Sequence, residues 1–217
     1  MAFSSVIGAS SVIKPGVVTS STRPSSPFVG QLIFETDTNR LAAYNGSAWV
    51  GVGGLVCVKA ETALSGTSVT ADNVFTSAYS NYIIMLRYTT VGNNAIFARL
   101  RTGGVSATGA NYNEQNISAV ATSPASARYT GQTYVQLATA SDGDYKSAST
   151  VNIFSPAIAE ATNFMSMQNT SYQGYTGIRW YSFYGNHTVA TSYDGIEMYC
   201  AGVMTGTYAI YGYSKTL

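Results

Sequence analysis

The stretch from Arg23 to Val52 constrains this chain most, because it predicts three short strands joined by two tight turns. Residues 30–36, 40–44 and 47–50 carry the apolar, β-branched and aromatic side chains that favour strands. Asn45-Gly46 separates the last two runs, and Asn-Gly in such a place is the strongest short-range signal for a hairpin. Polar residues also follow the first run, so the whole stretch predicts a β-meander.

A meander of this size buries too little apolar surface to be stable alone. Fixing the backbone of each residue costs roughly 1 to 2 kcal/mol, and a few short strands have little burial to offset that cost. We therefore expect residues 23–52 to act as a stalk that packs against further copies of itself or against a partner. The side chains expected to make this contact are Leu32, Ile33, Phe34, Leu41, Tyr44 and Trp49.

The same stretch carries a pattern of residues at fixed spacings. It reads R-P-x-x-P-x-x-G-Q, then T-D-T, then Y-x-G-x-x-W, and it ends at Trp49. In this pattern the chain resembles virion proteins of tailed bacteriophages, fibres and related appendages especially. The resemblance covers residues 23–49 and implies a virion component assembled in the cytoplasm of a host bacterium. The matching residues include Pro24, Pro27, Gly30, Gln31, Thr36, Asp37, Thr38, Tyr44, Gly46 and Trp49.

The composition favours a protein that works inside an assembly and argues against a nucleic-acid partner. Of the 217 residues, 46% are hydrophobic, which supports a real core, while only 10% are charged, against about 25% in ordinary soluble domains. Lys and Arg number 11 and Asp and Glu number 10, so no basic surface for phosphates is expected. So little charge favours self-association, and we expect an oligomer.

Residues 1–22 predict an extended attachment arm. Ser-Ser-Val-Ile occurs twice, and the even spacing of the copies keeps both Val-Ile pairs in the same orientation along an extended chain. The arm lacks the basic start and apolar core of a secretory signal, and no run approaches the ~18 apolar residues of a membrane span, so no membrane insertion is expected. We expect the arm to bind other virion proteins or another copy of this chain through Val6, Ile7, Val12 and Ile13.

Residues 51–54, which contain three glycines, predict a linker to a larger unit over residues 55–217. The run from Tyr82 to Tyr88 is apolar on both faces and predicts a strand in the middle of a sandwich. Turn-rich stretches separate the runs, so we expect an antiparallel, jelly-roll-like β-sandwich whose strand order the sequence leaves open. The other predicted strands are 56–60, 96–101, 134–137, 150–153, 178–184, 196–199 and 207–211.

Little in the sequence indicates catalysis. His187 is the one histidine of the chain, and no nucleophile motif or paired metal motif accompanies it, so residues 185–188 predict a polar hairpin loop. The scattered carboxylates give no obvious acid pair for glycoside hydrolysis. Cys57 and Cys200 are expected to be buried free thiols. We therefore expect no catalytic residue, no metal and no cofactor.

Binding is the chemistry that the sequence favours. The 17 tyrosines outnumber all Lys and Arg together, and Tyr offers a flat apolar face and a hydroxyl that suit protein interfaces and sugar rings. The densest aromatic group predicts a surface that contacts a receptor or a glycan. The alternative is that these side chains fill the sandwich or line a subunit seam. The predicted contact residues are Tyr172, Tyr175, Trp180, Tyr181, Tyr184, Asn186 and His187.

Three functions remain open. The first is a non-enzymatic virion appendage, a short homotrimeric fibre or spike whose arm anchors, whose stalk trimerises and whose head contacts the host surface. The second is a capsid decoration or cement protein that seals joints between capsid subunits, which the shortness of the stalk favours. The third is a polysaccharide-degrading enzyme on a β scaffold, for which the sequence offers the least support.

Overall fold

The chain forms two compact units, and both are built from β-strands. The computed structural model describes residues 15–51, 54–92, 94–120, 122–139, 147–170 and 179–214. The units divide between Gly54 and Leu55. The prediction of an all-β chain, with a short N-terminal meander followed by an antiparallel β-sandwich, is confirmed. Within the described ranges, no helix has the length and apolar character needed to cross a membrane.

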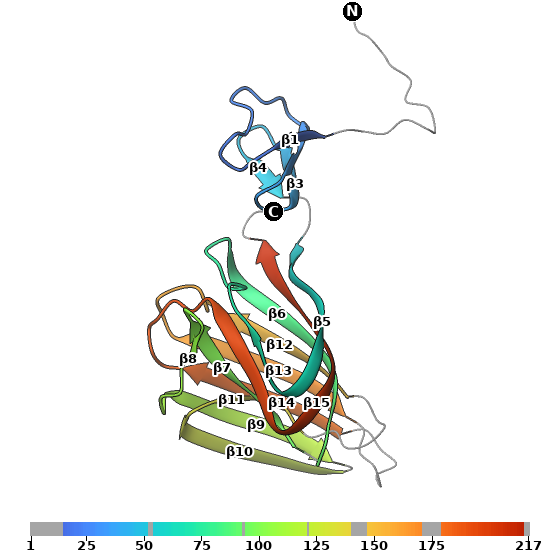
Figure 1. Ribbon diagram of the computed structural model, residues 1–217, viewed down its shortest axis with the longest axis vertical. Coiled ribbons are helices and arrows are strands. Elements are labelled where there is room, and N and C mark those ends of the chain that lie inside the picture. The colour runs from blue at the N-terminus through green and yellow to red at the C-terminus, as the bar shows by residue number, and fades with distance from the viewer. Residues whose placement is uncertain are drawn as a thin grey trace, which may run out of the picture. The chain divides into compact units, whose positions relative to one another are not determined.

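The first unit is a four-stranded sheet in the order β1, β2, β3, β4 (Figure 1). β2 (Leu32–Glu35), β3 (Arg40–Tyr44) and β4 (Trp49–Gly51) form the predicted meander. β1 (Gly16–Val18) pairs with β2 in parallel, so this part of the predicted arm adds a strand to the sheet. Gly46 has a φ of +104° in the last turn, a conformation that residues with a Cβ atom rarely adopt.

One face of this sheet holds a buried carboxylate. Glu35 shares its face with Ile33, and both side chains are fully buried. Arg23 donates to Glu35 Oε1 at 2.5 Å, while Thr38 and Arg40 donate to Oε2 at 2.8 and 3.4 Å. Burial alone would raise the pKa of Glu35, but these hydrogen bonds and the two positive charges outweigh it, so the pKa is lowered. Arg23 lies between β1 and β2, so this bond holds their connection against the sheet.

The second unit is a curled 11-stranded antiparallel sheet. Its hydrogen-bonded order is β10, β9, β14, β13, β12, β6, β15, β7, β11, with β5 beside β15 and β8 beside β7. Strand β11 contacts β9, β12, β13 and β14, so the sheet closes on itself as two packed layers. The strands are β5 (Leu55–Ala71), β6 (Tyr79–Thr90), β7 (Ile96–Thr102), β8 (Val105–Ser106), β9 (Tyr112–Val120), β10 (Ser123–Gln132), β11 (Val135–Ala138), β12 (Ser147–Phe154), β13 (Thr162–Thr170), β14 (Arg179–His187) and β15 (Gly195–Ser214).

A bent ribbon of β5 and β15 joins the two layers. Residues 195–199 of β15 pair with β7, residues 204–214 pair with β6, and β5 follows β15 along both parts. The register of β5 against β15 shifts between these two parts. Just beyond this shift, Gly206 has a φ of +153°, and a Cβ atom there would lie 1.9 Å from the carbonyl oxygen of Arg87 on β6. Glycine therefore permits the close approach of β15 to β6.

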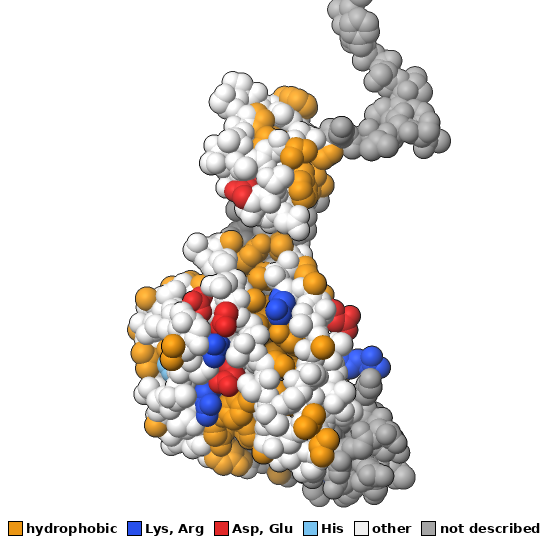
Figure 2. Space-filling view, in the orientation of Figure 1, with side chains coloured by type: hydrophobic (Ala, Val, Ile, Leu, Met, Phe, Trp, Pro, Cys, Tyr) orange, Lys and Arg blue, Asp and Glu red, His pale blue; other side chains and the backbone are white. Residues whose placement is uncertain are grey.

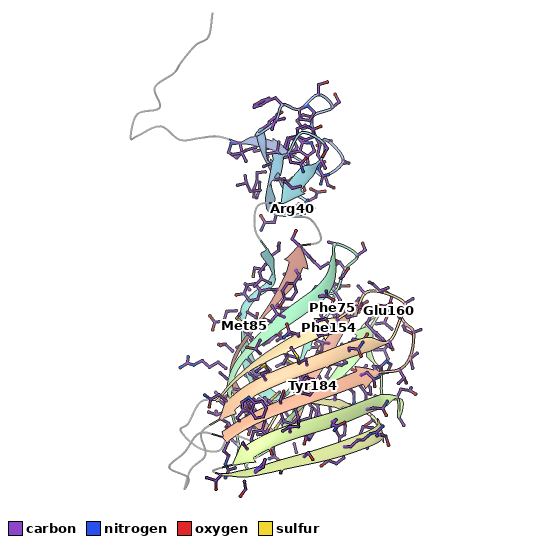
Figure 3. All side chains as sticks on the ribbon, turned by 180° about the vertical axis from the view of Figure 1, so that it is seen from behind. Arg40, Phe75, Met85, Phe154, Glu160 and Tyr184 are labelled. Carbon is purple, nitrogen blue, oxygen red and sulfur yellow. The ribbon has the colours of Figure 1, made fainter. Side chains whose placement is uncertain are left out.

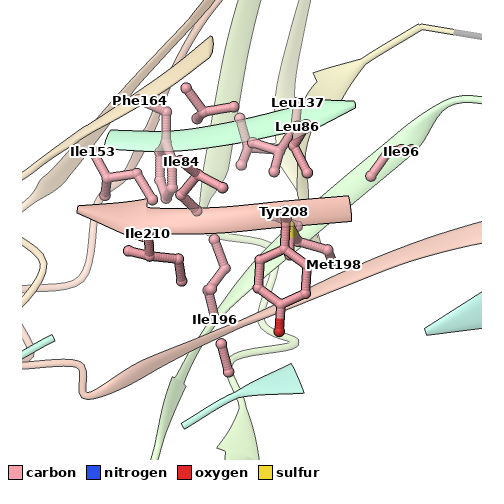
Figure 4. Close-up of a cluster of buried hydrophobic side chains, with 14 of the residues drawn as sticks. Ile84, Leu86, Ile96, Leu137, Ile153, Phe164, Ile196, Met198, Tyr208 and Ile210 are labelled. Carbon is pink, nitrogen blue, oxygen red and sulfur yellow. The ribbon is translucent and has the colours of Figure 1, made fainter. Parts of the chain in front are cut away.

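Apolar side chains from both layers fill the space between them (Figure 4). Ile84 and Leu86 on β6 and Phe164 on β13 come from one layer, and they are at most 4% exposed. Ile96 on β7 and Leu137 on β11 come from the other layer and are fully buried. Burying one such side chain completely contributes about 1.5–3 kcal/mol, so this cluster is the main source of stability of the sandwich.

The inner face also carries polar side chains, and these satisfy the backbone of the edge strand β11. Glu114 accepts the Gln136 N–H at 2.7 Å, and Gln168 accepts the Thr139 N–H at 2.6 Å. Two serine hydroxyls from β12 and β13 donate to the Leu137 carbonyl oxygen. Buried backbone groups require partners, so these side chains replace the strand that β11 lacks on one side.

The structure corrects several predictions about the second unit. The predicted strands 196–199 and 207–211 are parts of one strand, β15. Strands β9, β10 and β13 are not predicted by the sequence, since their Asn, Gln, Ser and Thr side chains hide any apolar alternation. Cys57 is exposed, contrary to prediction, because it lies on the edge strand β5, whereas Cys200 is a buried free thiol as predicted.

Candidate functional site

Strand β14 separates the predicted contact residues onto two faces, because successive side chains of a strand point to opposite sides. Trp180, Tyr184 and Asn186 lie on the outer face, where Trp180 is 40% and Tyr184 is 46% exposed. Tyr181 and His187 lie on the inner face, so the predicted cluster does not form one surface. Two further predicted residues lie outside the described part of the chain, Tyr172 and Tyr175.

His187 is 1% exposed, which contradicts its predicted place in a polar recognition loop. It is the last residue of β14, and the centre of its ring lies 4.3 Å from that of Tyr112 and 5.3 Å from that of Tyr193. The Tyr193 hydroxyl lies 3.2 Å from His187 Nδ1. Burial lowers the pKa of His187, so the imidazole is a neutral core side chain at pH 7.

A shallow groove of about 390 Å³ lies on the outer face around Tyr184. The strand register assembles it, because Tyr184 pairs with Gln115 of β9 and Gln115 pairs with Arg128 of β10. In the next row, one asparagine each from β9, β14 and β13 lie side by side, and these are Asn113, Asn186 and Asn163. The groove thus combines an aromatic ring, four carboxamides and a guanidinium. Glu114 and Gly185 also border it.

Most polar side chains of the groove have no partner within the described chain. Asn113 Nδ2 donates to Asn186 Oδ1 at 3.1 Å, and this bond orients two of the amides. The polar groups without a described partner are available to a ligand from solvent. Four groove side chains make no hydrogen bond or ion pair with another described residue, namely Gln115, Arg128, Asn163 and Tyr184.

The outer face continues beyond the groove with exposed apolar side chains. Figure 3 views the sandwich from this side, with Met85, Phe154 and Tyr184 labelled. Met85 and Met167 are 46% and 48% exposed. A second hollow of about 290 Å³ lies beside Trp180. Trp180 and Tyr184 lie on the same face of one strand, about 13 Å apart at ~3.3 Å per residue, so the two hollows share one surface.

The outward positions of the described strands on this face carry positive charge and no carboxylate. Arg87 and Arg128 occupy outward positions of β6 and β10, and neither forms an ion pair with a described residue. Glu114 is the one carboxylate in β6, β9, β10, β12, β13 and β14. Its side chain points to the inner face, where it accepts the Gln136 N–H, and burial raises its pKa. An anion therefore meets no like charge at the outward positions of these strands; the loop before β13 carries the exposed Glu160, three residues before Asn163.

A group of charged side chains at β7 and β15 has a structural role. Arg101 Nε donates to Asp72 Oδ1 at 2.7 Å, and Arg99 lies 3.7 Å from Glu197. Ser106 donates to Glu197 Oε2 at 2.8 Å, which ties β8 to β15. These charges satisfy one another, so they offer nothing to a ligand. Among the described residues, no group of three or more His, Cys, Asp or Glu could hold a metal ion.

Considering only the described residues of the first unit, one face of its sheet is open, and all the strand side chains on that face are apolar. Val17 is 66% exposed, Leu32 37% and Leu41 36%. Figure 2 shows apolar side chains gathered on this unit. The open face consists of two cross-strand rows, Val17, Phe34 and Leu41 in one and Leu32, Ala43 and Val50 in the other. Of the predicted stalk residues, three belong to it, namely Leu32, Phe34 and Leu41.

The other predicted stalk residues lie on the opposite face. Ile33 is fully buried within its own unit, so contrary to prediction it cannot contact a second copy. Tyr44 and Trp49 are half-buried cross-strand partners on the same face as Ile33, and their ring centroids are 5.4 Å apart. The predicted contact residues of the arm lie outside the described residues, namely Val6, Ile7, Val12 and Ile13.

The groove residues that sequence reasoning missed come from strands far from β14 in the chain. They are Asn113, Gln115, Arg128 and Asn163. The alternation of Asn113 and Gln115 with residues of the inner face is a signal for one exposed polar face, but it does not indicate which strand lies beside β9. No protein-family model and no curated protein matches this sequence. The functional proposal therefore depends on the geometry of the outer face.

Proposed function

We propose that this chain is a non-enzymatic structural protein of a bacteriophage virion whose outer sheet face binds surface polysaccharide of the host bacterium. The groove around Tyr184 is the observation that carries the proposal. It combines an exposed aromatic ring with carboxamides and a guanidinium that lack described partners, and this set suits sugar rings and their hydroxyls. The resemblance of residues 23–49 to tailed-bacteriophage virion proteins supports a place on a virion.

The shape of the outer face favours a polymer over a small molecule. Pockets for small ligands enclose most of the ligand, whereas this groove is shallow and a second hollow beside Trp180 lies on the same face. A polysaccharide can lie across both. Glycoside hydrolysis uses two carboxyl groups about 5–10 Å apart, whereas the described residues that line the groove include one carboxylate, Glu114, which is directed inward. We therefore favour binding without cleavage.

Retention of the full-length chain on immobilised bacterial surface polysaccharides tests the binding function. We expect saturable binding to at least one of them, and we expect Tyr184→Ala to weaken it about three- to tenfold through lost stacking. Tyr129→Ala is the matched control, because Tyr129 is similarly exposed, at 48%, but lies on the inner side of β10 opposite Glu114. Absence of binding across the panel, or an equal loss in both variants, would contradict the proposal.

The open apolar face of the first unit supports assembly into a homotrimer. Exposed apolar faces of this kind mark protein interfaces, and each Å² removed from water contributes about 25 cal/mol. Both rows of the face point away from the buried Glu35, so a second copy can cover them without disturbing the fold of the unit. The choice of three copies follows the resemblance to phage appendages.

Light scattering after size-exclusion chromatography tests this assembly. At micromolar concentration we expect three copies of the 22.9 kDa chain. Leu41→Lys should yield a folded monomer, because it places a charge in the centre of the interface. Val29→Lys is the control, since Val29 is 71% exposed but lies outside the two rows. A stable monomer of the unmodified chain would contradict self-assembly.

A capsid decoration protein is the second candidate. The exposed side chains of Met85, Met167 and Ile117 favour it, because adaptable apolar side chains on a flat sheet suit a protein surface such as a capsid joint. Mass spectrometry of purified capsids that lack tails separates the two candidates. Many copies per capsid would support decoration, whereas absence from such capsids would support an appendage.

A further inference from the structure

We infer that the groove around Tyr184 selects acidic polysaccharides, in which the carboxylate of a sugar residue binds the guanidinium of Arg128. This inference rests on the proposed function, since it specifies the class of glycan that the same groove takes. A groove for neutral sugars needs only aromatic rings, amides and hydroxyls. The position and the surroundings of Arg128 indicate a further requirement.

Arg128 is placed to bind an anion that comes from solvent. It is exposed on β10, directly opposite Gln115, and it borders the groove. It forms no hydrogen bond or ion pair with any described residue. The guanidinium presents a planar fork of N–H donors that matches a carboxylate through two parallel hydrogen bonds.

The surroundings of Arg128 also favour a negative ligand. The outward positions of the six strands β10, β9, β14, β13, β12 and β6 include no Asp or Glu in the described chain. Glu114 adjoins Gln115 in β9, the residue opposite Arg128, but its side chain is 5% exposed and directed inward. An acidic sugar therefore gains the attraction of Arg128 without repulsion from the outward positions of these strands, and Glu160, in the loop before β13, is the exposed carboxylate that its position in the groove must avoid.

The remaining groove side chains complete the recognition of such a sugar. The Asn113 and Asn186 amides are oriented by their mutual hydrogen bond, which leaves donor and acceptor groups for hydroxyls. Tyr184 offers its ring for stacking. Among the described residues that line the groove, Arg128 is the one cation, so it matches one negative charge, as a uronic acid carries, better than the nearly two charges of a phosphate monoester.

Arg87 supplies a control on the same face. Like Arg128, it is exposed and has no ion-pair partner among the described residues. Five strand spacings of ~4.8 Å separate β6 from β10, so Arg87 lies about 24 Å from Arg128, measured along the sheet. This separation exceeds the Debye length of about 8 Å at physiological salt, so Arg87 contributes little to a sugar in the groove.

The test uses a bacterial polysaccharide that retains the full-length chain, before and after methyl esterification of its carboxylates. Esterification should weaken binding about tenfold or more, as expected for a lost hydrogen-bonded ion pair. Arg128→Gln should cause the same loss with the native polysaccharide and no further loss with the esterified one. Arg128→Lys should restore part of the affinity, because it keeps the charge and loses the fork. Arg87→Gln should weaken binding less than Arg128→Gln does, because Arg87 pairs with Ala148 beside the second hollow and lies away from the groove.

The outcomes separate this inference from the function on which it rests. Equal binding before and after esterification, with Tyr184→Ala still defective, would leave a neutral-glycan site and overturn the inference alone. Loss on removal of phosphate instead of on esterification would also overturn it. Equal defects in Arg87→Gln and Arg128→Gln would indicate unspecific charge attraction and overturn it as well. If no polysaccharide binds, both proposals fail. Thermal unfolding of Arg128→Gln, with an expected midpoint close to that of the unmodified chain, verifies that the variant is folded.

Discussion

Replacing Glu114 tests whether polar side chains on the inner face hold the two layers of the sandwich together. Its Oε2 accepts the Gln136 N–H at 2.7 Å, and its Oε1 accepts from Asn116 at 3.3 Å. Glu114→Ala leaves the buried Gln136 N–H without an acceptor, which costs about 1–3 kcal/mol. In a unit of this size 1 kcal/mol corresponds to about 2–4 °C, so the variant should unfold about 2–12 °C lower.

Glu114→Gln is the matched control, because it keeps the size and an oxygen for the Gln136 N–H but cannot ionise. Burial raises the pKa of Glu114 above its usual value of 4.5. The folded chain therefore holds this proton to a higher pH than the unfolded chain does. The stability of the folded chain therefore falls as the pH rises from about 4.5 through the raised pKa, because the buried carboxylate becomes charged. Below about pH 4.5 the carboxyl group is protonated in both states, so this penalty for burying a charge is absent. The Gln variant escapes the penalty, so its stability relative to the unmodified chain should increase with pH.

Thermal unfolding of the three chains between pH 4 and pH 8, followed by circular dichroism, measures both effects. We expect Glu114→Ala to be the least stable at every pH. We expect Glu114→Gln to match the unmodified chain at the acid end and to equal or exceed it at the neutral end. If Glu114→Gln were as unstable as Glu114→Ala at neutral pH, the hydrogen bond to β11 could not be the reason for the loss, and the role assigned to the polar inner face would be refuted.

Two further substitutions test the first unit and the bent ribbon. Glu35→Gln should lower the free energy of unfolding of the first unit by about 3 kcal/mol. This is near the lower end of the cost of breaking a buried ion pair, because Arg23 and Arg40 are partly exposed. Faster hydrogen exchange of the backbone amides in β2 and β3 measures the loss. Since the pKa of Glu35 is lowered, the stability that its carboxylate contributes is complete above about pH 4.5 and is lost as the pH falls through the lowered pKa. Unchanged hydrogen exchange of the unmodified chain across that acid range would contradict this role of Glu35. Gly206→Ala should lower the free energy of unfolding by about 3 kcal/mol or prevent folding, because the added Cβ would lie 1.9 Å from the Arg87 carbonyl oxygen. Gly54→Ala is the control: a Cβ there meets no atom within 4 Å, so this variant should unfold at the same temperature as the unmodified chain.

The meander and the sandwich could be predicted because their signals are local. Asn45-Gly46 and the alternating runs beside it define β3 and β4 without help from the rest of the chain. The run from Tyr82 to Tyr88 is apolar on both faces and indeed lies in β6, between β12 and β15. The parallel strand β1 could not be predicted in this way. Gly16–Val18 pairs with β2 only because the intervening residues bring the chain back so that the two strands run in the same direction.

The candidate site could be predicted only in part, because strand pairing brings its residues together. Tyr184 and Asn186 stand out within one aromatic stretch, but the same stretch contains His187, and only the register of β14 shows that it points inward. Arg128 carries no signal of its own in a polar segment. It becomes part of the groove because β10 pairs with β9, and β9 pairs with β14.

Strands β9 and β13 lack an apolar pattern for two separate physical reasons, one on each face. On the inner face, Glu114 and Gln168 are polar because the edge strand β11 needs partners for its backbone there. On the outer face, Gln115 and Asn163 are polar because they are exposed to solvent, and they have no described partner. The first kind of polarity is a cost of closing the sandwich. The second kind leaves polar groups at the surface, and these are the groups that we propose bind the glycan.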